Sequence, residues 1–390
     1  MMERAIIHLN IADFAVAVET NMQTSLRGYP IIVAPQGERA VVYDMSDEAY
    51  QEGIRKGMPL ARALRLDKKI KILPPSFNRY ERVMKDLIKE AYVFTPRIES
   101  GRLDGHVFMD VTQSSRLFGP PVDVAFKLKK AFKKQFSLDP IWSVATNKLI
   151  AKVATRLVKP VGEYIVAPGD ETSFLAPLPI SLIPGFDQSD LSRLHEFNLT
   201  RVFQVRALTV DQLSVPFGER APVIHDRIRG IDPDPVKTFS ENESILQADY
   251  EFADDTNHTD FLRKALYILV ETICRSLRKQ ARQTDCAKII LSYSDGIQDN
   301  IRKRLKTPTA YDMVLFKQCT NLLQKAWTRR IRVRHMRLIC EKRPLRSIQT
   351  SLFTKPAKQD RHKRLVGTID RIREKFGKSA IQTGLTLITS

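Results

Sequence analysis

The chain has 390 residues, and its 63 Lys or Arg against 44 Asp or Glu give a net charge of +19. Charge of this sign and size favours a polyanionic partner such as a nucleic acid over a small neutral substrate. The alternative is that the positive charge serves only to keep the protein soluble. No apolar run is long enough to cross a membrane, which predicts a cytoplasmic protein without a membrane partner. Widely spaced cysteines (Cys274, Cys286, Cys319 and Cys340) predict buried or incidental thiols in a reducing compartment rather than a zinc site.

The first 170 residues alternate predicted strands and helices. An apolar strand of Ile6, Ile7 and Leu9 runs into a helix, with Asn10 at the junction where many α/β enzymes place a metal-binding carboxylate. Further strands are predicted within 30–44, in two pieces around Asp104 and Gly105, and at 141–148. Helices are predicted at 47–56, 78–95, 118–136 and 147–160. This order predicts a palm-like α+β domain.

Residues 171–240 change character and predict short helices around a turn at Pro184 and Gly185. A helix–turn–helix of this kind aims backbone N–H groups at a phosphate without reading base sequence. A purely structural helical spacer fits the pattern equally well. The polar stretch 237–248 then predicts a linker.

Residues 249–345 predict a split β–α–β pattern repeated once, with helices at 259–280 and 310–327. Period-two spacing predicts that two basic trios each share one sheet face, namely Arg302, Arg304 and Lys306 on one strand and Arg330, Arg332 and Arg334 on another. Segment 301–346 holds 14 Lys or Arg against Asp312 and Glu341, so its charge is expected to be single-signed and unpaired. We interpret the trios as a phosphate-tracking surface, with a solvated outer face as the alternative.

The tail, 346–390, contains the pentapeptide Gln349-Thr350-Ser351-Leu352-Phe353 in otherwise polar surroundings. Two adjacent large apolar side chains there suit docking into a partner's pocket; the alternative is that they fold back onto the body. Leu365, Ile369, Ile372 and Phe376 follow at helical spacing and predict a helix.

These residues resemble the Y-family translesion DNA polymerases of the DinB and UmuC type over nearly the whole chain. The family's first motif is His-Val-Asp-Met-Asp-x-Phe-(Phe/Tyr)-Ala-x-Val-Glu, and residues 8–19 read HLNIADFAVAVE in register. PSFNRYERV, FTPRIES, LDGHVFMDVT, ATNKLIAKVA and RIRGIDPDPV follow in the family's order, and QTSLF resembles the bacterial sliding-clamp-binding pentapeptide.

The resemblance implies a multidomain α+β fold of the right-hand polymerase type. Its parts would be a palm over 1–170 with fingers at about 28–75, a helix-hairpin-helix thumb over 171–240, a split βαβ little finger over 241–345, and a tail over 346–390 that carries the clamp motif and a short helix.

The resemblance also implies that the metal site is degenerate. In the family, two divalent cations are held mainly by an Asp of the first motif and by the Asp-Glu of Ser-Ile-Asp-Glu. The matching positions here are Asn10 and the pair Asp104-Gly105, so one of three carboxylates remains. Asp13 is expected to project elsewhere, and Asp110 to be structural. No metal or cofactor is therefore expected, and Mg²⁺ is expected only if the chain is an active polymerase.

The nucleotide pocket departs from the family as well. Ala15 stands at the aromatic position that excludes ribose, and Asp47 and Tyr50 stand where the fingers' Tyr and Arg hold the triphosphate. Lys152 matches the family's phosphate-binding lysine.

These departures predict a non-catalytic homologue, most similar to the ImuB-like branch. It would act in translesion synthesis and DNA repair within the SOS response, associated with the nucleoid. It would bind DNA through the basic trios and the sliding clamp through Gln349, Ser351, Leu352 and Phe353, and would recruit a catalytic polymerase or a recombinase-like partner. The alternatives are an active polymerase with an atypical metal site and an RNA-binding or regulatory module.

Overall fold

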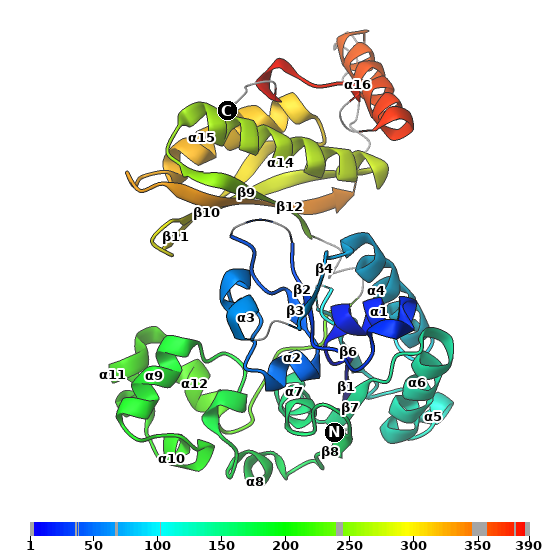
Figure 1. Cartoon of the computed structure of the whole chain (residues 1–390), viewed down its shortest axis with the longest axis vertical. Helices are drawn as coiled ribbons and strands as arrows, with labels where there is room; N and C mark the ends of the chain where they lie inside the picture. Colours follow the sequence, from blue (N-terminus) through cyan, green and yellow to red (C-terminus); the bar gives the residue numbers. More distant parts are fainter. Residues whose placement is uncertain are drawn as a thin grey trace. The chain divides into compact units, whose positions relative to one another are not determined.

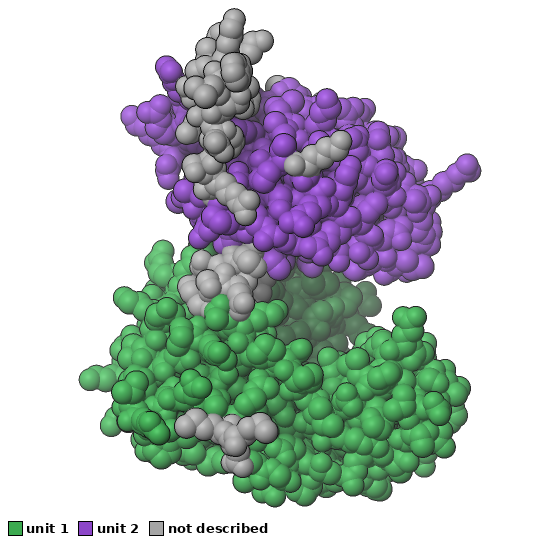
Figure 2. Space-filling model, turned by 180° about the vertical axis from the view of Figure 1, so that it is seen from behind, with its two compact units in different colours: residues 1–242 green, residues 243–390 purple. Residues whose placement is uncertain are grey.

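The computed structural model describes residues 4–386 except 36, 38, 67–68, 102, 239–244, 345–356 and 378–379, and without the side chains of Lys306 and 357–363. The chain divides into two compact units, residues 1–242 and 243–390 (Figure 2). Each unit builds its own sheets and hydrophobic cores. No helix in the described part of the chain is long and apolar enough to span a bilayer.

The central sheet of the first unit has the strand order β5-β6-β1-β7-β8. Its strands are β1 (Ile6–Asn10), β5 (Ile98–Ser100), β6 (His106–Asp110), β7 (Ile141–Ala145) and β8 (Glu163–Ile165). β1 pairs antiparallel with β6 and β7, whereas β8 runs parallel to β7. All five residues of β1 are buried because the strand is central and covered on both faces.

Helices cover this sheet on both sides (Figure 1). On one face, Ile7 and Leu9 join a core with α1 (Phe14–Met22), α4 (Phe77–Tyr92) and α6 (Pro121–Phe136), near the short α5 (Ser115–Phe118). On the other face, Ile6 packs with α7 (Lys148–Leu157), which starts at Asn147, whose side chain accepts the Ile150 N–H. Because strand side chains alternate, His8 and Asn10 project on the α7 face.

A small sheet of order β3-β2-β4 inserts after α1 with a core of its own. Its elements are β2 (Ile31–Val33), β3 (Asp44–Met45), α2 (Asp47–Gln51), α3 (Leu60–Leu66) and β4 (Lys71–Leu73). The helix predicted over 47–56 ends at Gln51, because the chain turns at Gly53 with a φ of 88°. Glycine adopts that conformation without strain and ends helices in this way.

The rest of the first unit is helical and packs with α7 in one core. Its helices are α8 (Glu171–Leu175), α9 (Gln188–Glu196), α10 (Val202–Arg206), α11 (Val210–Phe217) and α12 (Ala221–Arg227). α9 begins at a capping box formed by Asp187 and Asp190, directly after the predicted turn at Pro184 and Gly185. Gly185 has a φ of 100°, as a tight turn requires.

The second unit is an antiparallel sheet of order β11-β10-β12-β9 with α14 and α15 on one face (Figure 1). Its elements are β9 (Ile245–Thr256), α14 (Thr259–Lys279), β10 (Arg282–Tyr293), β11 (Gln298–Thr309), α15 (Asp312–Ala326), β12 (Val333–Pro344) and α16 (Ala357–Phe376). The split β–α–β pattern predicted from the sequence is confirmed. Within the described residues of this unit, the sheet face opposite α14 and α15 carries no helix.

Candidate functional site

Asn10 closes β1 and lies opposite His106 of β6 and Ile141 of β7. The side chain is only 1% exposed, and its amide nitrogen Nδ2 has no hydrogen-bond partner among the described residues. A neutral amide is a poor substitute for a carboxylate as ligand of a hard divalent cation. The end of β1 therefore presents an uncharged side chain where a metal ligand was expected from the family motif.

Asp104 lies in the turn between β5 and β6. Its Oδ1 accepts a hydrogen bond from the backbone N–H of His106 at 3.1 Å. The side chain folds back over Gly101, since a Cβ built on that glycine would lie 2.0 Å from Asp104 Oδ1. The remaining carboxylate is thus held by its own turn, as an Asx-type contact.

Gly105 follows with a φ of 75° and with no room for a side chain. A Cβ there would lie 2.8 Å from the backbone oxygen of Ile11 and 3.0 Å from Phe14 Cβ. Any other residue would combine backbone strain with a collision against backbone. The absence of a carboxylate at this position is therefore built into the local conformation.

His106, the next residue, was not anticipated as part of the site. Its Nδ1 lies 2.9 Å from His8 Nε2, and the two rings stack with centroids 5.1 Å apart. His8 Nδ1 lies 2.7 Å from Thr155 Oγ1 of α7. Burial, assisted by the charge of Lys152, lowers the pKa of His106 to about 3. The imidazole opposite Asn10 is therefore neutral near pH 7.

Cationic side chains act on this histidine pair. Lys152, Lys159, Arg156 and Lys56 each contribute to lowering the pKa of His106. Lys152 and Arg156 lie four residues apart on α7 and so share a helix face. Across the described ranges, no three His, Cys, Asp or Glu side chains converge to hold a metal ion. A neutral amide, a neutral imidazole and one turn-bound carboxylate among positive charges do not fit Mg²⁺, which requires anionic oxygen ligands.

An acidic group surrounds the start of α1, and Lys56 and Lys159 act on it as well as on His106. Asp44 is buried, accepts the backbone N–H of Ala15 at 2.7 Å, and pairs with Lys56 Nζ at 2.6 Å. Burial and the neighbouring Asp44 raise the pKa of Asp13, which precedes α1 with a φ of 46°. The positive end of the α1 dipole is thereby occupied by a carboxylate of the protein itself.

Of the residues predicted to form the nucleotide pocket, Ala15 and Asp47 contact or act on the acidic group at α1, and Lys152 acts on the histidine pair. Ala15 is buried, and Asp47 is exposed in the first turn of α2 and raises the pKa of Asp13. Tyr50 carries the Arg55 guanidinium 3.7 Å above its ring centre. Lys152 is instead coupled electrostatically to Arg156 and Asp104.

The predicted basic trios lie in the second unit. Arg302 and Arg304 alternate with the core residue Leu305 on β11, so they project on the face without helices. The side chain of Lys306 is outside the described part of the structure. β12 begins only at Val333, so Arg330 and Arg332 precede it and only Arg334 lies on the strand. The prediction of a second trio along one strand is therefore wrong.

The expectation that this charge is unpaired is also wrong. Arg302 pairs with Glu341, Arg304 with Asp285 at 3.3 Å, and Arg334 with Asp255 at 3.2 Å. Asp285 also pairs with Arg343 at 3.1 Å. Except for Glu341, these carboxylates come from β9 and β10, outside the basic segment, and sheet pairing brings them alongside. The tail residues Gln349, Ser351, Leu352 and Phe353 lie outside the described residues.

Comparison with known proteins agrees with the fold and with the order of the motifs. The impB/mucB/samB family matches residues 9–156, and the C-terminal domain of that family matches residues 245–352. The chain is 31% identical to DNA polymerase IV of Desulfatibacillum aliphaticivorans over 385 residues, which are 98% of this chain and 96% of the relative. It is 28% identical to DNA polymerase IV of Dehalococcoides mccartyi over 393 residues, covering 98% of this chain and 97% of the relative.

Solved structures show the same fold. A Y-family DNA polymerase chimera of Dbh and Dpo4 superposes with a TM-score of 0.73 at 19% identity, covering 86% of this chain and 98% of the chimera. DinB from Sulfolobus solfataricus superposes with a TM-score of 0.65 at 19% identity, covering 87% and 98% of the two chains. The chain therefore belongs to the Y-family DNA polymerases of the DinB and UmuC type.

Proposed function

We propose that this chain is a non-catalytic Y-family homologue that binds DNA and the sliding clamp as an adaptor in translesion synthesis and DNA repair. The observation that carries the proposal is the turn at Gly105, which has a φ of 75° and leaves no space for a carboxylate where the family's metal-binding motif has one. The relatives are named DNA polymerase IV. Loss of the reaction would distinguish this chain from polymerases of its own family.

The chemistry of the palm supports the loss of catalysis. Nucleotidyl transfer requires two divalent cations that activate the primer hydroxyl and neutralise the triphosphate. Asn10 and His106 are neutral, and Asp104 is held by its own turn. Positive side chains around them would repel a cation.

The acidic group at α1 supports the same conclusion for the nucleotide. Asp44 and Asp47 both act electrostatically on Asp13 there. Asp44 already accepts the Ala15 N–H, a backbone donor at a helix start that would otherwise favour a phosphate. A triphosphate at this end of α1 would lack that donor and would have to compete with Asp13 and Asp44 for Lys56 and Lys159.

For DNA we propose the division expected from the family: palm 1–170 with fingers at about 28–75, thumb 171–240 and little finger 241–345. Duplex phosphates would contact Arg302, Arg304, Lys306, Arg330, Arg332 and Arg334, together with the helical hairpin of the thumb. The exposed arginines on the helix-free sheet face support this assignment. The contacts would not depend on base sequence.

We further propose that the chain is closest in role to the ImuB-like branch of the SOS response. Gln349, Ser351, Leu352 and Phe353 would dock into the sliding clamp, and a catalytic polymerase or recombinase-like protein would be recruited alongside the nucleoid. A weak peptide contact and a non-specific DNA contact on one chain raise the apparent affinity of both.

The test is primer extension by the purified protein with Mg²⁺ and with Mn²⁺, beside fluorescence anisotropy of the same primer–template. We expect salt-sensitive DNA binding and no incorporation. Template-directed incorporation that disappears in Asp104→Ala would overturn the proposal and establish the alternative, an active polymerase with an atypical metal site. The retained Asp104 and its neighbour Lys152 are the observations that favour that alternative. Equal affinity for an RNA of the same length would instead indicate an RNA-binding module.

A further inference from the structure

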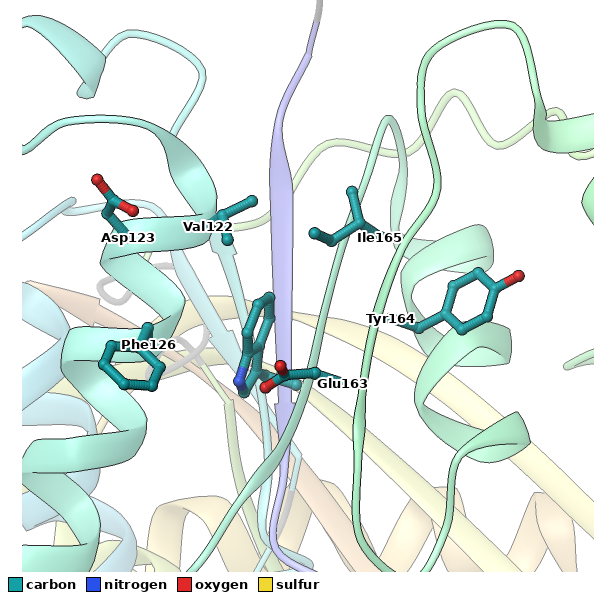
Figure 3. Close-up of a pocket in the computed structure, with 7 residues that line it drawn as sticks. Val122, Asp123, Phe126, Glu163, Tyr164 and Ile165 are labelled. Atoms are coloured by element: carbon teal, nitrogen blue, oxygen red, sulfur yellow. The ribbon is translucent and has the colours of Figure 1, made fainter.

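A notch opens at the edge of the central sheet of the first unit, away from the residues discussed so far (Figure 3). Its cavity of about 250 Å³ is lined by Val122, Asp123 and Phe126 of α6, Trp142 of β7, and Glu163, Tyr164 and Ile165 of β8. Trp142 itself is only 2% exposed.

Strand order explains why the notch is open. β8 is the outermost strand on its side of the described sheet, whereas α6 packs on β7 and β1. Trp142 and Glu163 are register partners, so their side chains share the α6 face, and Ile165 shares it two residues later. Tyr164 points the opposite way and packs against Phe174 with ring centres 5.1 Å apart. The face of β8 that points to the same side as α6 is therefore not covered by that helix, which packs on the neighbouring strands.

The walls of the notch are apolar and exposed. Phe126 is 57% exposed and Ile165 is 52% exposed, although both belong to well-formed elements. Exposed apolar side chains that gather around a hollow are typical of binding surfaces.

Two carboxylates complete the notch. Among the described residues, neither the Asp123 nor the Glu163 side chain has an ion-pair or hydrogen-bond partner, whereas Asp44 and Asp139 of the same unit pair with lysines. The indole N–H of Trp142, which lines the same notch, is buried without an acceptor in the described structure. An unpaired buried donor of this kind is destabilising, and an incoming acceptor would satisfy it.

We propose that this notch binds an extended segment of a partner protein whose arginine side chain enters beside the exposed Phe126 ring and between the two carboxylates. Two unpaired carboxylates in a chain of net charge +19 favour a cationic group at this place. A planar guanidinium stacks on aromatic rings and bonds a carboxylate through two N–H groups, which an ammonium does not. The free edge of β8 would pair with the backbone of the segment, as in other strand-addition complexes. The Trp142 N–H, which has no acceptor in the described structure, would be available to a backbone carbonyl of the segment.

The test uses the full chain and two labelled peptides, acetyl-Thr-Val-Arg-Val-Thr-amide and the same peptide with citrulline, a neutral isostere, in place of arginine. Fluorescence anisotropy should show the arginine peptide binding ~10-fold more tightly. The double variant Asp123→Asn, Glu163→Gln should remove this difference, and Phe126→Ala, a change at an exposed residue, should weaken both peptides. Asp86→Asn, at an exposed carboxylate on α4, removes the same kind of charge elsewhere and should change nothing.

Equal affinity of the two peptides for the unmodified chain would overturn the proposal, and so would an equal loss in Asp86→Asn or unchanged binding in Phe126→Ala. DNA binding is measured on the same samples and should not change in any variant. Failure of the unmodified chain to bind DNA would contradict the proposed adaptor function and leave this inference standing.

Discussion

Two glycines of the first unit separate the two reasons why position 105 excludes a side chain, namely backbone strain and steric collision. Gly28 and Gly105 have similar φ values of 78° and 75°, but a Cβ on Gly28 meets nothing within 4 Å. We expect Gly28→Ala to lower the free energy of unfolding by about 1 kcal/mol, the strain of a left-handed residue alone. Gly105→Ala should lower it by about 3 kcal/mol or more, because the methyl group also meets the Ile11 oxygen. Urea unfolding measures both, and equal losses would mean that Gly105 has room for a side chain.

The histidine pair predicts a pH dependence of stability. Because the pKa of folded His106 is about 3 and that of an unfolded histidine is about 6.5, the unfolded chain binds more protons between these values. Stability contributed by neutral His106 is therefore present above about pH 6.5 and lost as the pH falls toward 3. We expect His106→Gln to flatten the decline in unfolding free energy over this window, by up to ~1 kcal/mol per pH unit. A variant profile parallel to that of the unmodified chain would contradict the shifted pKa.

Sequence reasoning at this scale identified the residues of the first motif but not their partners. Asn10 follows from the gapless first motif, and Gly105 follows from the segment LDGHVFMDVT. His106 and Asp44 do not, because their roles depend on the register of β6 against β1 and on the contact of β3 with the start of α1. Neither can be read from spacing along the chain.

The ion pairs on the helix-free sheet face predict that its carboxylates compete with DNA phosphates. Asp285 holds both Arg304 and Arg343. If this face binds DNA, Asp285→Asn should release both arginines and raise DNA affinity about 3-fold at low salt, since such exposed pairs are individually weak. Asp260→Asn, at an exposed carboxylate in the first turn of α14 on the helical side, is the matched control.

Salt titrations by anisotropy complete that comparison. Arg304→Gln should weaken binding and reduce the slope of log affinity against log salt by about one. An unchanged slope in Arg304→Gln, or an equal gain in both aspartate variants, would place DNA on another surface.

Helices and strands were easier to predict from the sequence than the ion pairs between strands. The order of strands and helices in the second unit follows from alternation and helical periodicity, and each predicted helix there is present within a few residues. The neutralising carboxylates were missed because Asp255 lies 79 positions from Arg334 and meets it only once β9 pairs with β12. Arg330 and Arg332 were misplaced because the strand starts later than its charge pattern suggests.

On the scale of the whole molecule, the proposal joins two separate contacts in one chain. Leu352→Ala with Phe353→Ala should abolish capture by the sliding clamp and leave the affinity for free DNA nearly unchanged. On clamp-loaded primer–template the same variant should bind ~10-fold or more weakly, because the second contact no longer contributes. Surface plasmon resonance on both substrates measures this, and clamp capture that persists would assign docking to another segment.

The turn at Gly105 also affects how easily mutation could restore the metal-binding carboxylates that the family motif has in the palm. A single substitution of Asn10 by aspartate would place one carboxylate at the end of β1, with no acidic neighbour in the adjoining turn except Asp104, which is bonded to its own backbone. A carboxylate at position 105 would first require the turn to leave its φ of 75° and the Ile11 oxygen to withdraw. Intermediates on the way back would therefore lose stability before they gained a ligand, and selection would remove them. Under the proposed non-catalytic function, descendants of this chain are expected to diversify its binding surfaces and not to regain the reaction.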